Sequence, residues 1–142
     1  MKKAIVSVLA IAAVGLSSLA VSAQDLSKAP AGAKVSFVEP KNGDTVSSPF
    51  KVKFGLSGME ISPAGTEKPN SGHHHLLINQ KLADPKAGIP ADDTHKHYGK
   101  GQTEAEITLP AGKHTLQLVL GDHNHIPHDP IVQSEVITIT VK

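Results

Sequence analysis

Hydrophobic and polar residues alternate along several short stretches of this chain, and a period of two is the pattern of a β-strand with one buried face. Every second residue is apolar in residues 50–57, which read FKVKFGLS. From Leu116 to Leu120 every second residue is leucine, and residues 136–141 are rich in β-branched side chains. No stretch has the 3.6-residue period of a long amphipathic helix. The sequence therefore predicts an all-β fold.

Turn residues divide the chain into short strands. Asn42-Gly43 marks a turn between the first two strands, and Pro110-Ala111-Gly112 marks a tight hairpin. Many short strands in a single-domain chain of 142 residues favour an immunoglobulin-like antiparallel β-sandwich of six or seven strands. The expected strands are residues 35–39, 50–57, 73–79, 94–98, 104–109, 114–121 and 134–141.

The N-terminal segment has the pattern of a secretory signal peptide. Lys2 and Lys3 precede an apolar stretch, residues 4–19, which ends near the small-residue triplet Val21-Ser22-Ala23. The alternative is an uncleaved membrane anchor, but the serines, Gly15 and the small-residue end favour cleavage after Ala23. We therefore expect a periplasmic or secreted protein that leaves the membrane once it is cleaved. The expected organisation is a signal peptide at 1–23, a flexible lead-in at 24–33 and one domain at 34–142.

Composition excludes several classes of site and partner. The chain has no Cys, which rules out disulfides, thiolate nucleophiles, Fe–S clusters, Cys-rich zinc sites and blue-copper sites. Its formal net charge is +1, and its aromatic residues are three Phe and one Tyr. Such a chain offers neither a basic surface nor a base-stacking platform. Nucleic acid is therefore not an expected partner.

Histidine is the unusual residue of this sequence. The chain has nine, of which eight fall in residues 73–75, 95–97 and 123–128, while His114 stands apart. Each group contains a His-x-His pattern. On a strand, residues two apart point to the same face with Cα atoms about 6.5 Å apart. Two such imidazoles can converge on one ion with bonds of about 2.1 Å.

The predicted topology brings the histidine groups together. If residues 73–79 and 114–121 are strands C and F of an immunoglobulin-like sandwich, they are antiparallel neighbours. The start of strand C then lies at the same end as the loop that follows strand F, so the first and third groups meet. The chain between 79 and 104 returns toward that end, which allows the 95–97 group to join them.

This convergence leads to the hypothesis of a divalent metal site. Imidazole ligation suits Zn²⁺, Cu²⁺ or Ni²⁺, and the order of intrinsic affinities favours Cu²⁺. We take Cu²⁺ or Zn²⁺ as the expected ion, with Asp122 and Asp129 as hydrogen-bond acceptors that orient the imidazoles. The candidate ligands are His73, His75, His95, His97, His123, His125 and His128.

Some histidines also have a structural interpretation. His74 and His114 share a strand face with leucines or isoleucine, so we expect both to be structural. His128 lies in a turn braced by prolines and is open to a hydrogen-bonding role, and His97 is open to being a solvated loop residue. For the whole cluster, the alternatives to metal binding are a hydrogen-bonded histidine network and incidental surface histidines.

Four runs of the sequence resemble a family of exported bacterial domains whose function is unknown. The similarity covers about residues 70–141 and implies a small secreted domain with an immunoglobulin-like sandwich. The family carries no assigned activity, so the resemblance implies compartment and fold but no chemistry. The runs are GHHHLLI at 72–78, IPAD at 89–92, HYGKGQTE at 97–104 and HTLQL at 114–118, which leads into GDHNHIPH at 121–128.

Three functional classes follow from these observations. The first, which we favour, is a periplasmic metal-binding protein that buffers or delivers the ion, with the ion and another periplasmic protein as partners. A metal enzyme of redox or hydrolytic type needs an open coordination position beside an acid or base, for which Glu60, Glu67 and Asp92 are the nearest candidates. No His-Glu-x-x-His motif is present, and we expect no enzyme. The alternative is a non-enzymatic adaptor for a protein or glycan, with the histidines structural or pH-sensing.

Overall fold

The structure, a computed structural model, describes Gly15 and residues 25–142. The predicted signal peptide and its cleavage site, Gly15 apart, lie outside the described residues. Within this part of the chain no helix is long and apolar enough to cross a membrane. Its strands are β1 (Lys34–Glu39), β2 (Thr45–Val46), β3 (Phe50–Ser57), β4 (Glu60–Ile61), β5 (Ser71–Ile78), β6 (His95–His97), β7 (Glu104–Ile107), β8 (Gly112–Gly121) and β9 (Ile137–Val141).

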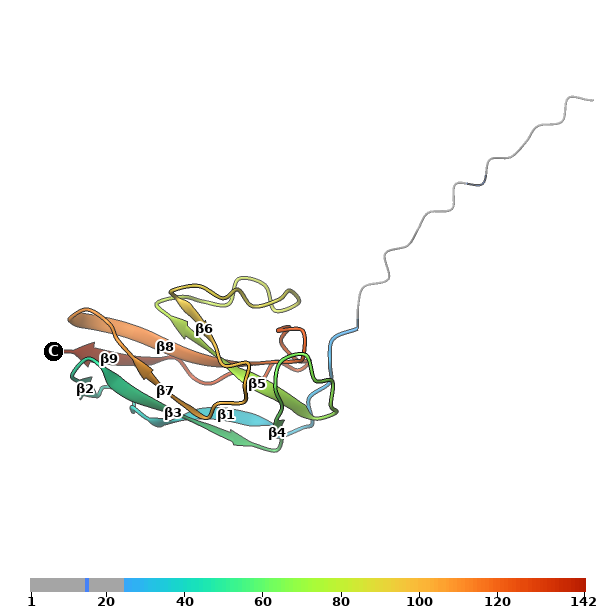
Figure 1. The fold of residues 1–142 in the computed structure, drawn as a ribbon, viewed down its shortest axis with the longest axis horizontal. Coiled ribbons are helices and arrows are strands. Elements are labelled where there is room, and N and C mark those ends of the chain that lie inside the picture. The colour runs from blue at the N-terminus through green and yellow to red at the C-terminus, as the bar shows by residue number, and fades with distance from the viewer. Residues whose placement is uncertain (1–14, 16–24) are drawn as a thin grey trace, which may run out of the picture.

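The strands form two facing sheets, as Figure 1 shows. One sheet has three strands in the order β1-β3-β7, and the other has the order β2-β9-β8-β5-β4 with β6 paired to β5. The long pairs are antiparallel, including β5 with β8 and β8 with β9. The predicted all-β sandwich is therefore confirmed. The strands that the prediction lacked, β2 and β4, are two residues long and pair in parallel with β9 and β5.

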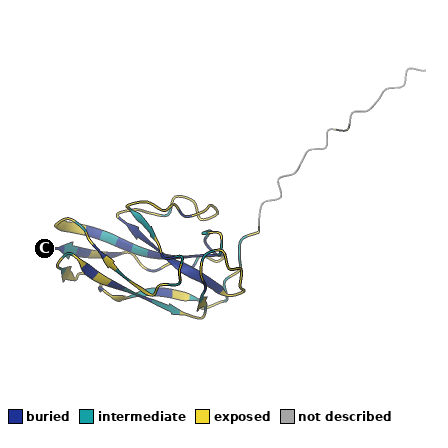
Figure 2. Ribbon diagram, in the orientation of Figure 1, coloured by how far each residue is buried: buried dark blue, intermediate teal, exposed yellow. Residues whose placement is uncertain are grey.

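The main core lies between the two sheets. Phe50, Val52 and Phe54 of β3 point inward and are at most 6% exposed, while Lys51 between them is exposed. Leucines of β8 meet them from the other sheet and are fully buried. This alternation is the reason that the bounds of β3 are those predicted from the sequence. Figure 2 shows β5 as a continuous run of buried residues, whereas buried residues along β3 are interrupted by more exposed ones.

Strand β5 differs from β3 because all eight of its residues are buried. His74, Leu76 and Ile78 face the other sheet. On the opposite face, Leu77 packs with Val119 and Ile89 in a second, smaller apolar cluster. The chain segments that follow β5 and β8 therefore cover this outer face, and they enclose His73 and His75 together with it.

Candidate metal centre

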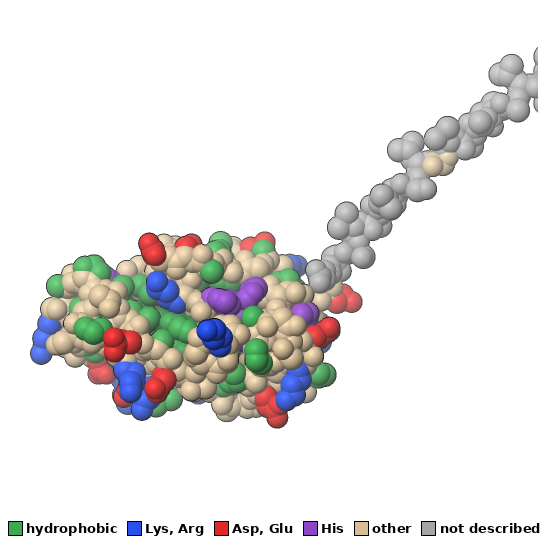
Figure 3. Space-filling view, in the orientation of Figure 1, with side chains coloured by type: hydrophobic (Ala, Val, Ile, Leu, Met, Phe, Trp, Pro, Cys, Tyr) green, Lys and Arg blue, Asp and Glu red, His purple; other side chains and the backbone are tan. Residues whose placement is uncertain are grey.

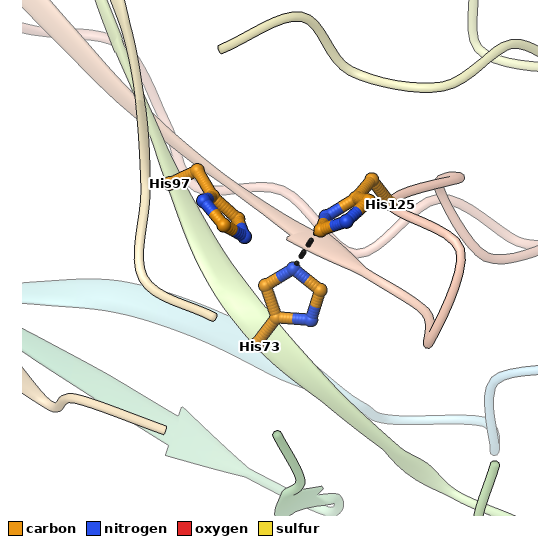
Figure 4. A group of neighbouring side chains, drawn as sticks. All are labelled: His73, His97 and His125. Atoms are coloured by element: carbon orange, nitrogen blue, oxygen red, sulfur yellow. Dashed lines mark hydrogen bonds between the residues drawn. The ribbon is translucent and has the colours of Figure 1, made fainter. Parts of the chain in front are cut away.

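Three segments of the chain carry imidazoles to one place on the outer face of β5. His73 and His75 lie two residues apart on this strand and share that face. β6 pairs antiparallel with β5 so that His97 lies directly opposite His75. His125 reaches the same place from the turn that follows β8, and Figure 4 shows its ring and those of His73 and His97 turned toward one another. The predicted meeting of the first and third histidine groups is thus confirmed.

The nitrogens of these rings lie close together. One ligand nitrogen from each of His73, His97 and His125, called here the histidine trio, lies within 4.8 Å of the other two. Nε2 of His73 is 3.0 Å from Nδ1 of His125 and 2.9 Å from Nε2 of His75. Nitrogens bound to one tetrahedral ion at about 2.1 Å are separated by about 3.4 Å. These two nitrogen pairs therefore stand at nearly the separation that a shared ion requires, and the nitrogen of His97 lies within 4.8 Å of those of His73 and His125.

Access to the site is one-sided. His73 is 0% exposed and His75 is 1% exposed, whereas His97 is exposed and His125 is half-buried. Figure 3 shows histidine side chains grouped at the surface on one face of the molecule. An ion at the trio would thus have the buried His73 and His75 on its inner side, and it would enter from solvent on the side of His97.

Burial keeps the deep imidazoles neutral. Desolvation is the largest cause that lowers the pKa of His73, and the charges of the neighbouring His125 and His97 contribute as well, so that this pKa is about 4. For His75, desolvation is again the largest cause and the charges of His73 and His97 add to it, so that its pKa is lowered to about 2. Burial and the nearby His125 also lower the pKa of His97. Because only a neutral imidazole offers a lone pair to a metal, these residues are ready to coordinate an ion at neutral pH.

Two glycines make the room that the rings occupy. A Cβ atom on Gly121 would lie 2.7 Å from Nε2 of His75, and one on Gly99 would lie 2.5 Å from Nε2 of His97. Any side chain at either position would displace an imidazole. The sequence alone does not identify these two glycines, because their role depends on the β5–β8 register and on the path of the chain after β6. A glycine two residues from a histidine group is the signal that could have identified them.

Asp122 organises the turn that presents His125. Its Oδ1 accepts hydrogen bonds from the backbone N–H groups of Asn124, at 2.8 Å, and Ile126, at 3.0 Å. Ser27 Oγ donates to the other carboxylate oxygen at 2.7 Å. Burial by itself raises the pKa of Asp122, but the hydrogen bonds from Ser27 and the turn outweigh it and hold the pKa below its usual value. Asp122 therefore fixes the backbone around His125, which has a left-handed φ of 64°.

The remaining candidate residues lie apart from the trio and have other partners. His95 Nδ1 contacts Asp92 at 2.7 Å, and His123 Nε2 contacts Asn124 at 3.0 Å. His128 is buried, and its Nε2 donates to the carbonyl of Ser71 at 3.0 Å. Asp129 is exposed and forms an ion pair with Lys28 at 2.8 Å. The sequence instead predicts that it accepts a hydrogen bond from an imidazole ligand.

Two histidines have the structural positions predicted for them. His74 is 1% exposed in the main core, with its ring centroid 4.8 Å from that of Phe54. His114 donates from Nε2 to the carbonyl of Pro110 at 2.8 Å and accepts at Nδ1 from Asn79 at 2.9 Å. The hydrogen bonds of His114 are therefore explained without an ion, whereas His74 is held by packing, since neither of its ring nitrogens has a hydrogen-bond partner among the described residues.

A model of a protein family described as a domain of unknown function (DUF4399) matches residues 52–142, well over half of the chain. The chain belongs to the DUF4399 family. The matched span contains β5, β6, β8 and the turn after β8, and with them the whole histidine trio and His75. The histidine centre of this DUF4399 domain therefore lies within the part that defines the family match.

Comparison with solved structures gives two similar chains. An endo-beta-1,4-mannanase from Thermotoga petrophila is 16% identical with a TM-score of 0.43, over 78% of this chain and 20% of the mannanase. The fibronectin(III)-like modules of Clostridium thermocellum CbhA are 12% identical with a TM-score of 0.37, over 75% of this chain and 92% of theirs. The DUF4399 chain thus spans about a fifth of the mannanase. The comparison with curated proteins gives no significant match.

Proposed function

We propose that this DUF4399 domain binds a divalent transition metal, Cu²⁺ or Zn²⁺, through His73, His97 and His125. Its role would be to buffer the ion or deliver it outside the cytoplasm. The observation that carries the proposal is the convergence of three imidazole nitrogens, from three separate segments, within 4.8 Å. An all-imidazole set of this kind suits these ions.

Hydrogen bonding alone satisfies the cluster poorly. A neutral imidazole has one N–H donor and one acceptor nitrogen. Nε2 of His73 lies at hydrogen-bond distance from two other imidazole nitrogens, and it has either one proton or one lone pair to share between them. A bound cation accepts a lone pair from every ring at once. Metal binding therefore explains why so many imidazoles are held together in a buried place.

Buffering or delivery is favoured over catalysis because three of the candidate carboxylates, Asp122, Asp92 and Glu60, have other partners. Asp122 is held by Ser27 and the backbone of its own turn. Asp92 contacts His95, and Glu60 forms an ion pair with Lys68. A general acid or base beside the metal would have to be free of such contacts to exchange a proton with substrate.

A second candidate is a non-enzymatic adaptor for a protein or glycan, in which the cluster is structural or senses acid pH. The observation in its favour is that His73 contacts both His75, at 2.9 Å, and His125, at 3.0 Å, directly. Protonation of such a cluster would drive the rings apart. This candidate predicts no tight metal binding, so one titration separates it from the first.

Isothermal titration of the protein with Zn²⁺ and with Cu²⁺ at pH 7 tests the proposal. We compare the wild type with His97→Ala and with His95→Ala, since both residues lie on β6 but only His97 belongs to the trio. The expected result is one tight site that His97→Ala weakens by about 10- to 100-fold and His95→Ala leaves unchanged. Weak binding that neither variant changes would contradict the proposal.

A further inference from the structure

A fourth imidazole stands beside the histidine trio. The ring of His75 has its centroid 4.6 Å from that of His73, 5.5 Å from that of His97 and 5.6 Å from that of His125. Within the trio, the centroid of His73 is 5.3 Å from that of His97 and 4.9 Å from that of His125. The remaining pair, His97 and His125, is separated by 4.6 Å. All six distances between the four rings thus fall between 4.6 and 5.6 Å.

These six distances describe a tetrahedron. An ion about 2.1 Å from one nitrogen of each ring lies about 3.2 Å from each centroid, so tetrahedral imidazoles have centroids about 5.2 Å apart. In a square arrangement the two diagonals are about 1.4 times the sides. Here the longest distance, 5.6 Å, exceeds the shortest, 4.6 Å, by a factor of only about 1.2. The four ring centroids are therefore arranged as a tetrahedron rather than in one plane. Among the ligand nitrogens, those of the trio lie within 4.8 Å of one another, and Nε2 of His75 lies 2.9 Å from Nε2 of His73.

His75 needs a partner once His73 coordinates an ion. In the structure the 2.9 Å contact with His73 engages Nε2 of His75, and Nδ1 of His75 has no hydrogen-bond partner among the described residues. Coordination through Nε2 of His73 would use the lone pair on which that contact depends. His75 is 1% exposed, so water does not replace the lost contact. The ion can then take the lone pair of His75 in place of that contact.

We propose that His75 is the fourth ligand and that the tetrahedral four-histidine shell is matched to Zn²⁺ rather than to Cu²⁺. This inference rests on the proposed function, because it concerns the same site. Zn²⁺ imposes no geometry of its own and is usually tetrahedral in four-ligand sites, whereas Cu²⁺ prefers a square or tetragonal arrangement.

The protein resists the flattening that Cu²⁺ requires. His73 and His75 are fixed on β5, a strand that is buried on both faces, and His97 is fixed opposite His75 by the pairing of β6 with β5. The carboxylate of Asp122 holds the turn that carries His125. Because the backbone positions are fixed, the rings reach one plane only by leaving their present rotamers, and for His73 and His75 the close packing around β5 opposes that change.

Substitution of Co²⁺ for Zn²⁺ provides the test, because tetrahedral Co²⁺ absorbs visible light strongly and octahedral Co²⁺ absorbs it weakly. We expect the Co²⁺-loaded wild type to give the intense tetrahedral spectrum. In His75→Leu, which retains a buried apolar side chain of similar size, this spectrum should be lost. The same variant should lose about 100-fold or more in Zn²⁺ affinity but about 10-fold or less in Cu²⁺ affinity.

A second pair of variants leaves every histidine in place. Gly121→Ala puts a methyl group 2.7 Å from Nε2 of His75, so it should also remove the tetrahedral Co²⁺ spectrum. Gly88→Ala is the matched control, since its Cβ would have its nearest neighbour at 3.9 Å. Circular dichroism and thermal unfolding show whether each variant is folded. If the His75→Leu variant failed to fold, the comparison of Gly121→Ala with Gly88→Ala would still test the inference.

The outcomes separate this inference from the proposed function. Tight binding with a tetrahedral Co²⁺ spectrum that depends on His75 and Gly121 supports both. Tight binding with an octahedral spectrum, or with a spectrum that His75→Leu leaves unchanged, overturns the four-histidine shell and leaves the metal site standing. No binding of Co²⁺, Zn²⁺ or Cu²⁺ overturns the proposed function and this inference with it.

Discussion

Nε2 of His73 lies 3.0 Å from Nδ1 of His125, although the two residues are 52 positions apart in the sequence. The contact joins the start of β5 to the turn that follows β8. It exists because β5 and β8 pair antiparallel with His73 opposite Gly121, the last residue of β8. The turn after Gly121 then folds back over the face of β5 that carries His73.

Replacement of His125 tests whether this turn contributes a ligand. In His125→Ala we expect Zn²⁺ affinity to fall by about 10- to 100-fold, because one imidazole of the trio is lost. His123→Ala is the matched control on the same turn, since His123 contacts only its neighbour Asn124 among the described side chains. Competition with a colorimetric chelator measures both affinities. Equal losses in the two variants would mean that the turn acts through its fold and not through His125.

Asp122 should affect metal binding without contacting the ion. Its carboxylate accepts two backbone hydrogen bonds within the turn and a third from Ser27. In Asp122→Ala we expect about 1–3 kcal/mol less stability and a weaker metal site, while Asp122→Asn, which keeps one acceptor oxygen, should be intermediate. Asp129→Ala serves as control, since its exposed ion pair with Lys28 contributes little. Chemical unfolding and Zn²⁺ titration of the same samples give both quantities.

The metal-free protein should lose stability as the pH falls below about 6.5. The unfolded chain titrates its histidines near 6.5, whereas burial lowers the folded-state pKa to about 4 for His73 and His74 and to about 2 for His75. Between those values the unfolded state binds more protons, so stability is fully present above 6.5 and decreases as the pH falls toward 4. Each imidazole contributes a slope of up to about 1.4 kcal/mol per pH unit.

Urea unfolding at pH 7, 6 and 5 in the presence of EDTA measures this slope. His74→Leu removes one of these three imidazoles and should reduce the slope of stability against pH by the contribution of one group. His74 is suited to this test because its pKa is lowered by burial alone. A free energy of unfolding that stays constant from pH 7 to pH 5 would show that these histidines are not buried as the structure has them.

His114 should matter for stability and not for metal. His114→Ala removes the donor to the Pro110 carbonyl and the acceptor for Asn79. We expect a loss of about 1–3 kcal/mol in the free energy of unfolding, because two hydrogen bonds of about 0.5–1.5 kcal/mol each are lost together with the packing of a buried ring. Zn²⁺ affinity should equal that of the wild type. A marked loss of Zn²⁺ affinity in a variant that remains folded would mean that His114 takes part in metal binding.

The parts of the fold that follow from side-chain alternation were predictable from the sequence. The bounds of β3 follow from one buried and one solvated face, and the pairing of β5 with β8 follows from the sandwich topology. β5 gives no alternation because both of its faces are buried, and it begins at Ser71, two residues before the predicted start at His73. The segment that covers its outer face includes Ile89, which no period-two pattern marks.

The subset of histidines that converges was not predictable in the same way. His97 and His95 share a strand face, and only the register that sets His97 opposite His75 decides between them. His125 and His128 lie on one loop, but the left-handed backbone at His125 turns its ring toward His73 while His128 is buried against Ser71. Register and single backbone angles are tertiary properties, and spacing in the sequence carries no information about them.

The most direct test of the account is the metal content of the protein isolated from its native compartment without an affinity tag or chelator. Elemental analysis should find about one equivalent of a transition metal, and a triple variant of His73, His97 and His125 to Ala should retain none. If the wild type carried no metal and bound added Zn²⁺ and Cu²⁺ no better than the triple variant, the histidine centre would not be a metal site. The adaptor function would then be the one to pursue.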